Sequence, residues 1–320
     1  MSVIFSLDEI KRPFKNPVLT IGNFDGVHRG HLGLFNKVKE RAKAIGGQSI
    51  VMTFEPHPAK VMRPGNGPLL ITPTDQKLEL MEQAGMDAVI CVPFNRAFAA
   101  VSAEDFVKKI LVGKIGIKEM VVGYDYTFGY QRQGNLELLR KMGHELGFLV
   151  HVIGPIEIDH TPVSSTSIRQ LVQAGQIKAA KDQLGRDFQI SGKVVPGQGR
   201  GKKLLGFPTA NLSWTDGLYP KPGVYAVRVL LEGRTYYGVT NIGYNPTFEN
   251  QVLTIETHIF DFAVNIVDKT IKLEFVERIR DEKNFGNPGE LKDQIALDID
   301  RAKEILGIKE AKMFFRSGKG

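Results

Sequence analysis

The hydrophobic pattern of this chain changes its period once, and that change limits the possible folds more than any other feature. From Val18 to about Gly185, short runs rich in β-branched residues alternate with longer runs that have helical spacing. Such alternation is typical of parallel strands whose sheet is covered by helices. After Gly185 the runs are strand-like and follow one another closely, which favours an antiparallel sheet or a small barrel. At roughly 150 residues per domain, a length of 320 residues agrees with two domains, 1–185 and 186–320.

The individual runs give the expected elements. In the first domain we expect strands at 18–21, 49–54, 88–93, 120–122 and 149–153, and helices at 32–45, 75–84, 103–112 and 136–146. Ser102 and Asn135 stand where N-cap residues belong. In the second domain we expect strands at 223–231, 235–242, 253–260 and 270–276, with a tight connection at Glu232-Gly233. Apolar residues at helical spacing from Leu291 to Leu306 predict one closing amphipathic helix.

Composition excludes several classes of protein. Hydrophobic residues make up 42% of the chain and charged residues 24%, which is ordinary for a globular protein and argues against long disorder or fibres. No apolar run approaches the roughly 18 residues of a membrane span. Asp8 and Glu9 interrupt the stretch that a signal peptide would need, and the single cysteine, Cys91, excludes an intrachain disulfide. We therefore expect a cytoplasmic protein that does not enter a membrane.

Positive charge is spread along the chain rather than concentrated. The formal net charge is +7, and one short stretch without acids contains Lys193, Arg200, Lys202 and Lys203. A nucleic-acid-binding protein usually concentrates its basic residues on one face or tail. A small phosphorylated ligand would suit this stretch equally well, and we expect no nucleic-acid partner.

The first strand runs directly into the segment Gly22-Asn-Phe-Asp-Gly-Val-His-Arg-Gly-His31, and a helix follows at once. In open parallel sheets, ligands bind at the carboxyl ends of strands, where helix N-termini favour phosphate. Gly22 and Gly26 allow close approach of the backbone. His28 and His31, three residues apart, share one helix face and can donate hydrogen bonds to a phosphate that gathers charge. Isolated histidines at this spacing would more often be a metal pair or a solvated helix start, but the combined arrangement favours phosphate chemistry.

This block resembles the His-x-x-His signature of the nucleotidyltransferase superfamily, which transfers nucleotidyl groups without a covalent enzyme intermediate. Ser164-Ser-Thr-Ser-Ile-Arg169 is similar to the late phosphate-binding motif of that superfamily, although a serine run before a helix is by itself more often an N-cap. The resemblance implies a Rossmann-like parallel sheet in the first domain. It also implies catalytic roles for His28, His31 and Arg169, and ATP contacts from Gly22, Asn23, Phe24, Gly26, Ser164, Ser165 and Thr166.

Two further segments resemble one branch of the superfamily, the prokaryotic FAD synthetases. They are Thr53-Phe-Glu-Pro-His-Pro58 and Val122-Gly-Tyr-Asp-Tyr-Thr-Phe-Gly129. Without that resemblance, their aromatic residues would more often be core or loop packing. The resemblance implies that this domain binds FMN through Phe54, Pro56, His57, Pro58, Asp125 and Phe128, with Asp125 standing where some members carry Asn.

Residues 197–211 read Gly-Gln-Gly-Arg-Gly-Lys-Lys-Leu-Leu-Gly-Phe-Pro-Thr-Ala-Asn. The spacing fails both the Walker pattern and the dinucleotide-binding pattern, so the stretch alone could be a flexible basic loop. Its end, Gly206-Phe-Pro-Thr-Ala-Asn211, resembles the Pro-Thr-Ala-Asn motif of riboflavin kinases, and further kinase motifs follow in order up to Arg278-Ile-Arg-Asp-Glu282. The resemblance implies Mg²⁺ ligation by Thr209 and Asn211, nucleotide-phosphate binding by Gly199, Gly201 and Lys203, and a flavin contact from Arg280.

Glu256 is the general base that the kinase resemblance implies. Alternation in its strand predicts Leu253, Ile255, Thr257 and Ile259 on one face, with Glu256 on the opposite face. From the strand pattern alone, a solvated surface carboxylate is the commoner outcome. The motif around Glu256 favours the base.

Together the resemblances imply a bifunctional riboflavin kinase and FAD synthetase. The second domain, a mainly antiparallel β-barrel with a closing helix, would phosphorylate riboflavin to FMN with ATP. The first would adenylylate FMN to FAD and release pyrophosphate, and flavin-dependent apoenzymes are candidate recipients of the FAD. Two alternatives stay open: a nucleotidyltransferase acting on another phosphate or carboxylate, and a module that binds RNA or DNA. The sequence does not indicate the oligomeric state.

Overall fold

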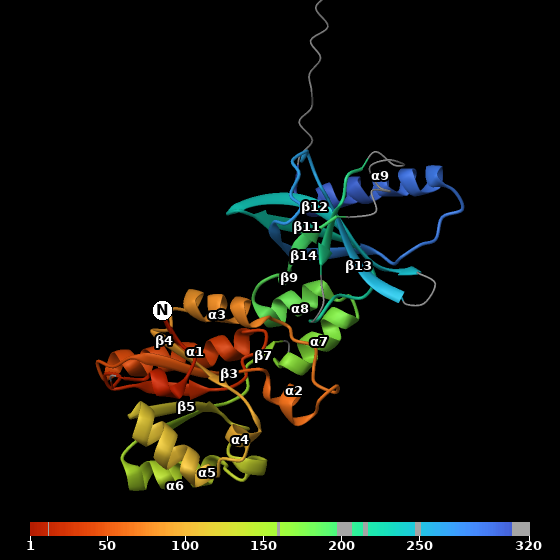
Figure 1. Ribbon diagram of the computed structural model, residues 1–320. Helices are drawn as coiled ribbons and strands as arrows, with labels where there is room; N and C mark the ends of the chain where they lie inside the picture. The colour runs from red at the N-terminus through yellow and green to blue at the C-terminus, as the bar shows by residue number, and fades with distance from the viewer. Residues whose placement is uncertain (12, 159–160, 197–206, 214–216, 247–250, 309–320) are drawn as a thin grey trace, which may run out of the picture. The chain divides into compact units, whose positions relative to one another are not determined.

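The computed structural model describes residues 1–11, 13–158, 161–196, 207–213, 217–246 and 251–308 (Figure 1). The chain divides into two compact units. The first contains Met1–Arg169 and Gln183–Gly185, and the second contains Gln170–Asp182 and Arg186–Gly320. Within the described residues, no helix is both long and apolar enough to cross a membrane.

The first unit is built on a six-stranded sheet in the order β1-β4-β3-β2-β5-β6, and all of its pairings are parallel. The strands are β1 (Ser2–Ile4), β2 (Val18–Ile21), β3 (Ser49–Glu55), β4 (Ala88–Pro93), β5 (Glu119–Gly123) and β6 (Leu149–Ile153). Five of them confirm the sequence prediction. The sixth, β1, spans only three residues and pairs with β4 at the edge. The direction of strand order reverses between β2 and β5, which is where an open parallel sheet offers a ligand-binding crevice.

Helices cover both faces of this sheet (Figure 1). On one face, α1 (Arg29–Ala44) and α3 (Thr74–Gln83) bury Phe35, Val38 and Met81 against one side of the strands. On the other face, the π-helix η2 (Phe106–Ile115) and α6 (Leu136–Leu146) complete a second apolar cluster. The strands are apolar at successive positions because both of their faces are buried. Shorter elements are η1 (Leu7–Glu9), α2 (Pro58–Met62), α4 (Arg96–Ala99), α5 (Ala103–Asp105), η3 (Tyr130–Arg132), β7 (Glu157–Ile158) and β8 (Thr161–Pro162).

The predicted helix boundaries have clear local causes. The side chain of Ser102 accepts a hydrogen bond from the Asp105 amide, and that of Asn135 accepts one from the Leu138 amide, so both expected N-caps are confirmed. The first helix starts earlier than expected, at Arg29, because His28 acts as its N-cap. Two helices, α7 (Ser165–Gln173) and α8 (Ile177–Leu184), follow one another in the sequence before β9 (Phe188–Val195).

The second unit is a closed barrel in the order β10-β13-β12-β11-β14-β9, in which all pairings are antiparallel. Its strands are β9 (Phe188–Val195), β10 (Ala210–Ser213), β11 (Gly223–Leu231), β12 (Arg234–Pro246), β13 (Gln251–Ile259) and β14 (Thr270–Arg280), and α9 (Pro288–Ile305) follows as the expected closing helix. Glu232 and Gly233, with φ of 49° and 77°, form the tight turn between β11 and β12. Strands β9 and β10 were not expected from the sequence.

Candidate active sites

The first candidate site starts at the carboxyl end of β2, beside the reversal of strand order. Its loop follows the sheet at Gly22, whose amide donates to the Met52 carbonyl over 3.1 Å. The loop then turns sharply, with Phe24, Gly26 and Val27 all at positive φ. The Gly26 amide donates to Thr72 Oγ over 3.0 Å, which holds the turn against the segment before α3. A glycine at position 26 is required because φ is 89° there.

His28 and His31 lie face to face at the start of α1. Their ring centroids are 3.5 Å apart and their planes differ by 21°, so the two imidazoles share one helix face as expected. His28 is 5% exposed, and its Nδ1 accepts a hydrogen bond from the His31 amide over 3.4 Å. In the neutral ring this leaves the proton on Nε2, which can act as a donor. The buried Phe24 ring packs edge-on against His31 at 5.1 Å and fixes its orientation.

Asp25 joins the two sequence motifs of this site. Its carboxylate is 4% exposed and accepts hydrogen bonds from the amides of Ile71 and Thr72 over 3.0–3.1 Å. The same carboxylate forms an ion pair with Arg169, and the Asp25 carbonyl accepts a hydrogen bond from Ser165 Oγ over 2.8 Å. Asp25 is not among the functional residues predicted from the sequence. The signal in the sequence was an acidic residue inside a loop expected to bind phosphate, where a negative charge needs a cationic partner.

The residues of the late motif have distinct positions. Arg169 also donates through Nε to the Leu69 carbonyl over 2.8 Å. Ser164 Oγ accepts a hydrogen bond from the Ser167 amide and so caps α7, while Thr166 is exposed on that helix. The capping reading of the serine run is therefore correct for Ser164. It is compatible with a phosphate site, because a capped helix start still presents amides and hydroxyls.

The segments assigned to the flavin lie at the ends of β3 and β5. Phe54 packs against Phe94 and Phe98, with centroid distances of 5.6 and 5.9 Å. Pro56 is exposed, and Pro58 opens α2. His57 is the N-cap of α2: its Nδ1 accepts a hydrogen bond from the Ala59 amide over 3.1 Å, and burial lowers the pKa of its imidazole.

The β5 end holds the other two flavin assignments. Asp125 is exposed just after the strand. Phe128 is 7% exposed and packs on Phe106 and Tyr126 at 6.0 and 5.6 Å, so it belongs to the aromatic core beneath the β5 end. Burial also raises the pKa of the Tyr126 hydroxyl. At this strand end Asp125 is therefore accessible to a flavin, whereas the Phe128 ring is buried.

The second candidate site lies across three strands of the barrel. Glu256 of β13 is directly opposite Asn211 of β10 on one side and Asn241 of β12 on the other. Ile255 and Thr257 are buried at 1% and 0% exposure, so Glu256 points to the opposite face, as the alternation predicts. Directly opposite residues have Cβ atoms roughly 4.5–5.5 Å apart. One carboxylate and two amides therefore form a row, and Asn241 is a member that the sequence analysis did not single out.

The start of β10 is anchored to β13 next to this row. His258 Nδ1 is 2.9 Å from the Pro208 carbonyl oxygen, and its ring lies 5.4 Å from that of Phe207. Thr209 is exposed immediately before the strand. The predicted nucleotide-binding residues Gly199, Gly201 and Lys203 lie outside the described residues.

A second carboxylate approaches the row from the end of β14. A Cβ atom at Gly243 would lie 1.9 Å from Glu282 Oε1 and 3.4 Å from Asn241 Nδ2. Glycine at this position therefore leaves the space that the Glu282 carboxylate occupies beside Asn241. The Gly243 carbonyl also accepts a hydrogen bond from Thr254 Oγ over 3.3 Å, which fixes β12 at this point.

Arg280 is tied to the closing helix. Its Nε and NH2 donate to the Asp298 carboxylate of α9 over 2.7–3.0 Å, and NH1 donates to the Asp281 carbonyl over 2.9 Å. Asp298 is 4% exposed, and the guanidinium carbon lies 5.9 Å from the centre of the Phe285 ring. The arginine therefore holds the end of β14 against α9.

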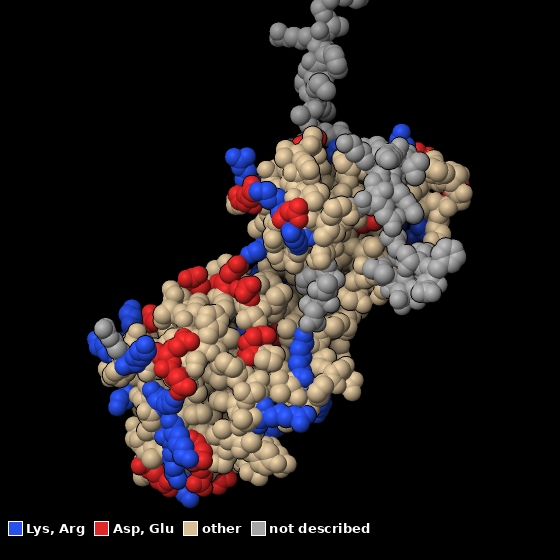
Figure 2. Space-filling view, viewed as in Figure 1, with Lys and Arg blue, Asp and Glu red and all other residues tan. Residues whose placement is uncertain are grey.

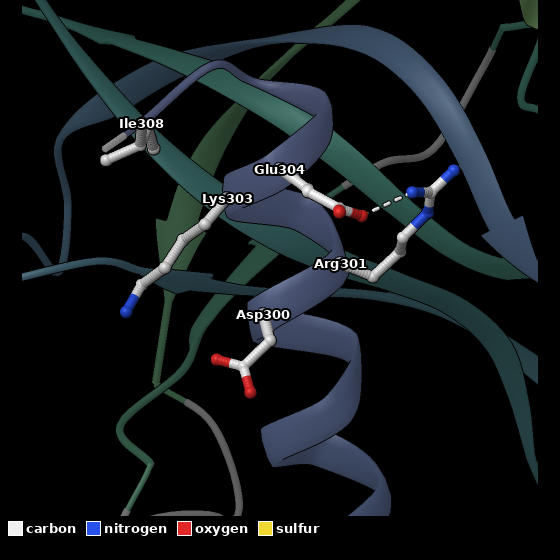
Figure 3. A pocket seen from close by; sticks show the side chains of 5 residues that line it. All are labelled: Asp300, Arg301, Lys303, Glu304 and Ile308. Carbon is white, nitrogen blue, oxygen red and sulfur yellow. Dashed lines mark hydrogen bonds and ion pairs between the residues drawn. The ribbon is translucent and has the colours of Figure 1, made fainter. Parts of the chain in front are cut away.

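A hollow beside the last turns of α9 lies outside both candidate sites. It is lined by Asp300, Arg301, Lys303, Glu304 and Ile308, and Arg301 pairs with Glu304 (Figure 3). None of the residues assigned to phosphate, flavin or metal lines it. Four of its five lining residues are charged, whereas cofactor pockets are lined mainly by hydrophobic and aromatic side chains.

Comparison with known proteins identifies both halves. A family model described as FAD synthetase matches residues 10–167, and one described as riboflavin kinase matches residues 184–306. A bifunctional riboflavin kinase/FMN adenylyltransferase of Buchnera aphidicola is 37% identical over 302 residues, covering 93% of this chain and 96% of that protein. The protein of the same name from Escherichia coli K12 is 38% identical over 297 residues, covering 92% and 95%. A crystal structure described as a macrolide-efflux protein from Streptococcus pneumoniae is 31% identical, with a TM-score of 0.84 and coverage of 92% and 96%.

Proposed function

This chain belongs to the family of bifunctional riboflavin kinases/FMN adenylyltransferases, and we propose how its two reactions are divided between its two halves. The enzyme phosphorylates riboflavin to FMN and adenylylates FMN to FAD, using ATP in both steps. Residues 1–185 carry the adenylyl transfer, and residues 186–320 carry the kinase reaction. The observation that supports this division best is the Asp25 contact, which brings the loop with both histidines and the late motif to one site.

In the first half, the FMN phosphate attacks the α-phosphorus of ATP. A bond forms between an FMN phosphate oxygen and that phosphorus, the bond from the phosphorus to the β-phosphate bridging oxygen breaks, and pyrophosphate leaves. His28, His31 and Arg169 stabilise the charge that gathers on the transferring group. Gly22, Asn23, Phe24 and Gly26 shape the loop around the phosphates, together with Ser164, Ser165 and Thr166. Orientation supplies the rest, since no side-chain nucleophile is needed.

The flavin end of FMN is bound at the ends of β3 and β5. Phe54, Pro56, His57 and Pro58 form one side of this subsite, and Asp125 lies at the other strand end. Phe128 contributes from beneath, because its ring supports the aromatic cluster from the core. In the sheet β2 lies between β3 and β5, so a ligand bound where the strand order reverses would reach both strand ends.

In the second half, Glu256 accepts the proton of the riboflavin 5′-hydroxyl. The 5′-oxygen of riboflavin attacks the γ-phosphorus of ATP, and ADP leaves. Asn211 and Asn241 on either side of Glu256 hold the reacting groups in register. Positioning of this kind is the main contribution of a protein to phosphoryl transfer. Gly199, Gly201 and Lys203 bind the nucleotide phosphates, and Arg280, which pairs with Asp298, contacts the flavin.

Thr209 and Asn211 would hold Mg²⁺ together with the ATP phosphates. Their donor atoms are neutral oxygens at the start of β10, and Asn211 is opposite the Glu256 carboxylate. Such a donor set suits Mg²⁺, which keeps several waters and takes few protein ligands. Across the described parts of the chain, no group of three or more His, Cys, Asp or Glu is placed to form an all-protein cage. When bound, the ion neutralises charge on the phosphates.

We extend the proposal to the cellular setting of the enzyme. We place it in the cytoplasm, with flavin-dependent apoenzymes as recipients of its FAD. Nucleic acid is not expected as a partner, because the basic residues are spread along the sequence. On the visible face, Lys and Arg side chains lie beside Asp and Glu rather than in one continuous basic surface (Figure 2).

The direct test is a product analysis. Purified protein is incubated with riboflavin, ATP and Mg²⁺, and in parallel with FMN, ATP and Mg²⁺, and the flavins are separated by chromatography. The proposal expects FMN from the first reaction and FAD from the second. Formation of neither product would refute it and return the first half to a nucleotidyltransferase of other specificity.

A further inference from the structure

Lys77 is a buried lysine at the edge of the adenylyltransferase site, and none of the sequence motifs contains it. It belongs to α3 and is 6% exposed. Its ammonium group donates to Thr53 Oγ over 3.1 Å and to the Phe54 carbonyl over 3.2 Å. Both acceptors belong to the carboxyl end of β3, where the flavin-binding segment begins. The side chain therefore reaches from the helix beneath the site to the strand end that forms it.

Thr53 carries this contact on to the phosphate-binding loop. Its side chain is completely buried, and its hydroxyl donates to the Asn23 carbonyl over 3.1 Å. One hydroxyl thus accepts from Lys77 and donates to Asn23. The Lys77 ammonium can only donate, so the Thr53 hydroxyl must accept from it and is left to donate its single proton to the Asn23 carbonyl. The chain Lys77–Thr53–Asn23 connects the end of β3 to the loop that follows β2.

The position of the charge adds to the case. Within the described residues, the Lys77 ammonium has no carboxylate within salt-bridge distance, although buried charges are normally paired. The ionisable groups that act on it are Cys91, Glu55 and Asp25, and burial lowers the pKa of its ammonium. Asp25 is itself committed to Arg169. The two oxygens that the ammonium contacts are both neutral, and its charge strengthens both hydrogen bonds at the end of β3.

We infer that Lys77 is a positioning residue for FMN adenylylation, acting through Thr53 on the Asn23 carbonyl and directly on the Phe54 carbonyl. It sets the loop that faces the triphosphate relative to the segment that faces the flavin, so that the attacking phosphate and the α-phosphorus meet in line. This inference rests on the proposed function of the first half. It gives a polar role to the first turn of α3, a helix whose Met81 packs against the sheet.

The test uses the full-length enzyme and both of its reactions. Lys77→Met removes the cation, and Thr53→Val removes the hydroxyl while keeping the shape of the side chain. For each variant we expect kcat for FAD formation from FMN to fall roughly tenfold to a hundredfold, as a misplaced reacting geometry does. The KM for ATP is expected to change less than about threefold, and FMN formation from riboflavin stays at its normal rate. Thr53→Ser restores the hydroxyl and recovers most of the rate that Thr53→Val loses.

The double variant separates a relay from two independent effects. If Lys77 and Thr53 act through the same series of hydrogen bonds, breaking it at one residue removes the effect of both. The double variant of Lys77→Met and Thr53→Val should then be no slower than the slower single variant. The inference would be overturned if the rate losses of the two single variants multiplied in the double variant, or if only KM rose. It would also be overturned if both reactions were lost equally, or if Lys77→Met formed FAD at the normal rate. If Lys77→Met does not fold, the comparison of Thr53→Val with Thr53→Ser decides. Failure of the unsubstituted enzyme to form FAD would instead refute the proposed function.

Discussion

Asp25 and Arg169 form a buried ion pair although 144 positions separate them in the sequence. The aspartate lies in the loop after β2, and the arginine lies in α7, which comes after all six strands of that sheet in the sequence. Four further hydrogen bonds surround the Asp25 carboxylate on the side of Ile71 and Thr72. The pair is thus the point where three separate segments meet at the adenylyltransferase site.

Replacing Asp25 with Asn should therefore impair one reaction far more than the other. Asn removes the charge that holds Arg169, and it accepts fewer hydrogen bonds from the Ile71 and Thr72 amides. We expect FAD formation to fall at least tenfold while FMN formation is kept, and the free energy of unfolding to fall by about 1–3 kcal/mol. Product chromatography and urea unfolding measure the two effects. Full FAD formation by Asp25→Asn would show that the pair has no part in the site.

The two active sites should be separable by single substitutions. His28→Ala removes a donor from the transferring phosphate, and we expect it to abolish FAD formation while leaving the conversion of riboflavin to FMN intact. Glu256→Ala should do the opposite when FMN is supplied as substrate. Separate assays of the two reactions check this. A folded single variant that loses both activities would contradict the assignment of two independent sites.

The Glu119 carboxylate should contribute to stability in a pH-dependent way. It is 3% exposed and accepts hydrogen bonds from Arg41 over 2.7–2.8 Å, and His151 Nε2 lies 2.7 Å away. The hydrogen bond with Arg41 lowers the pKa of Glu119 below its ordinary value of 4.5. The folded state thus favours the ionised form, so the stabilisation is present above pH 4.5 and is lost as the pH falls through the lowered value.

Glu119→Gln checks this directly. At pH 7 we expect the variant to unfold about 1–3 kcal/mol more easily, because the Arg41 guanidinium loses its charged acceptor. The difference should shrink as the solution is made more acidic. Urea unfolding followed by circular dichroism at several pH values measures it. Glu119 is the first residue of β5 and lies at the end of the strand away from the candidate site. A difference in unfolding free energy that persisted unchanged in acid would argue against the ion pair with Arg41 as its cause.

Gly243 should be a sensitive position in the kinase half. A methyl group there would collide with the Glu282 carboxylate, which must then leave its place beside Asn241. We expect Gly243→Ala to lower FMN formation roughly tenfold, on the scale of a small misplacement. Glu282→Ala should have a similar effect, and the double variant should be no worse than either single variant. FMN formation at full rate by Glu282→Ala would show that this carboxylate does not serve the kinase site.

Much of the architecture could be predicted because the interior imposes it on the sequence. Strands β2 to β4 are apolar at nearly all positions since helices cover both of their faces, and β11 and β12 are joined by a turn in which Gly233 suits its positive φ. β1 was missed because three residues are too few to show a period. β9 does alternate between buried and half-buried positions, so its pattern was present but lay next to the domain boundary.

The polar network of the first site was harder to predict than its motifs. His28 and His31 could be placed on one face because helix geometry fixes residues three apart. Asp25 and Lys77 meet partners that are far away in sequence, and no local spacing encodes those contacts. Arg280 shows the same limit, since its pairing with Asp298 depends on how α9 docks against the barrel.

The register of the barrel also has a consequence for how the enzyme can fail. Side chains alternate between the two faces of a strand, so a slip of β13 by one residue would turn Glu256 into the apolar interior and bring Ile255 and Thr257 outside. A closed barrel has no free edge along which such a slip could be relieved. The strand register that buries the apolar side chains is therefore the same one that directs the Glu256 carboxylate to the kinase site. A molecule that folded with β13 shifted by one residue would have no kinase activity.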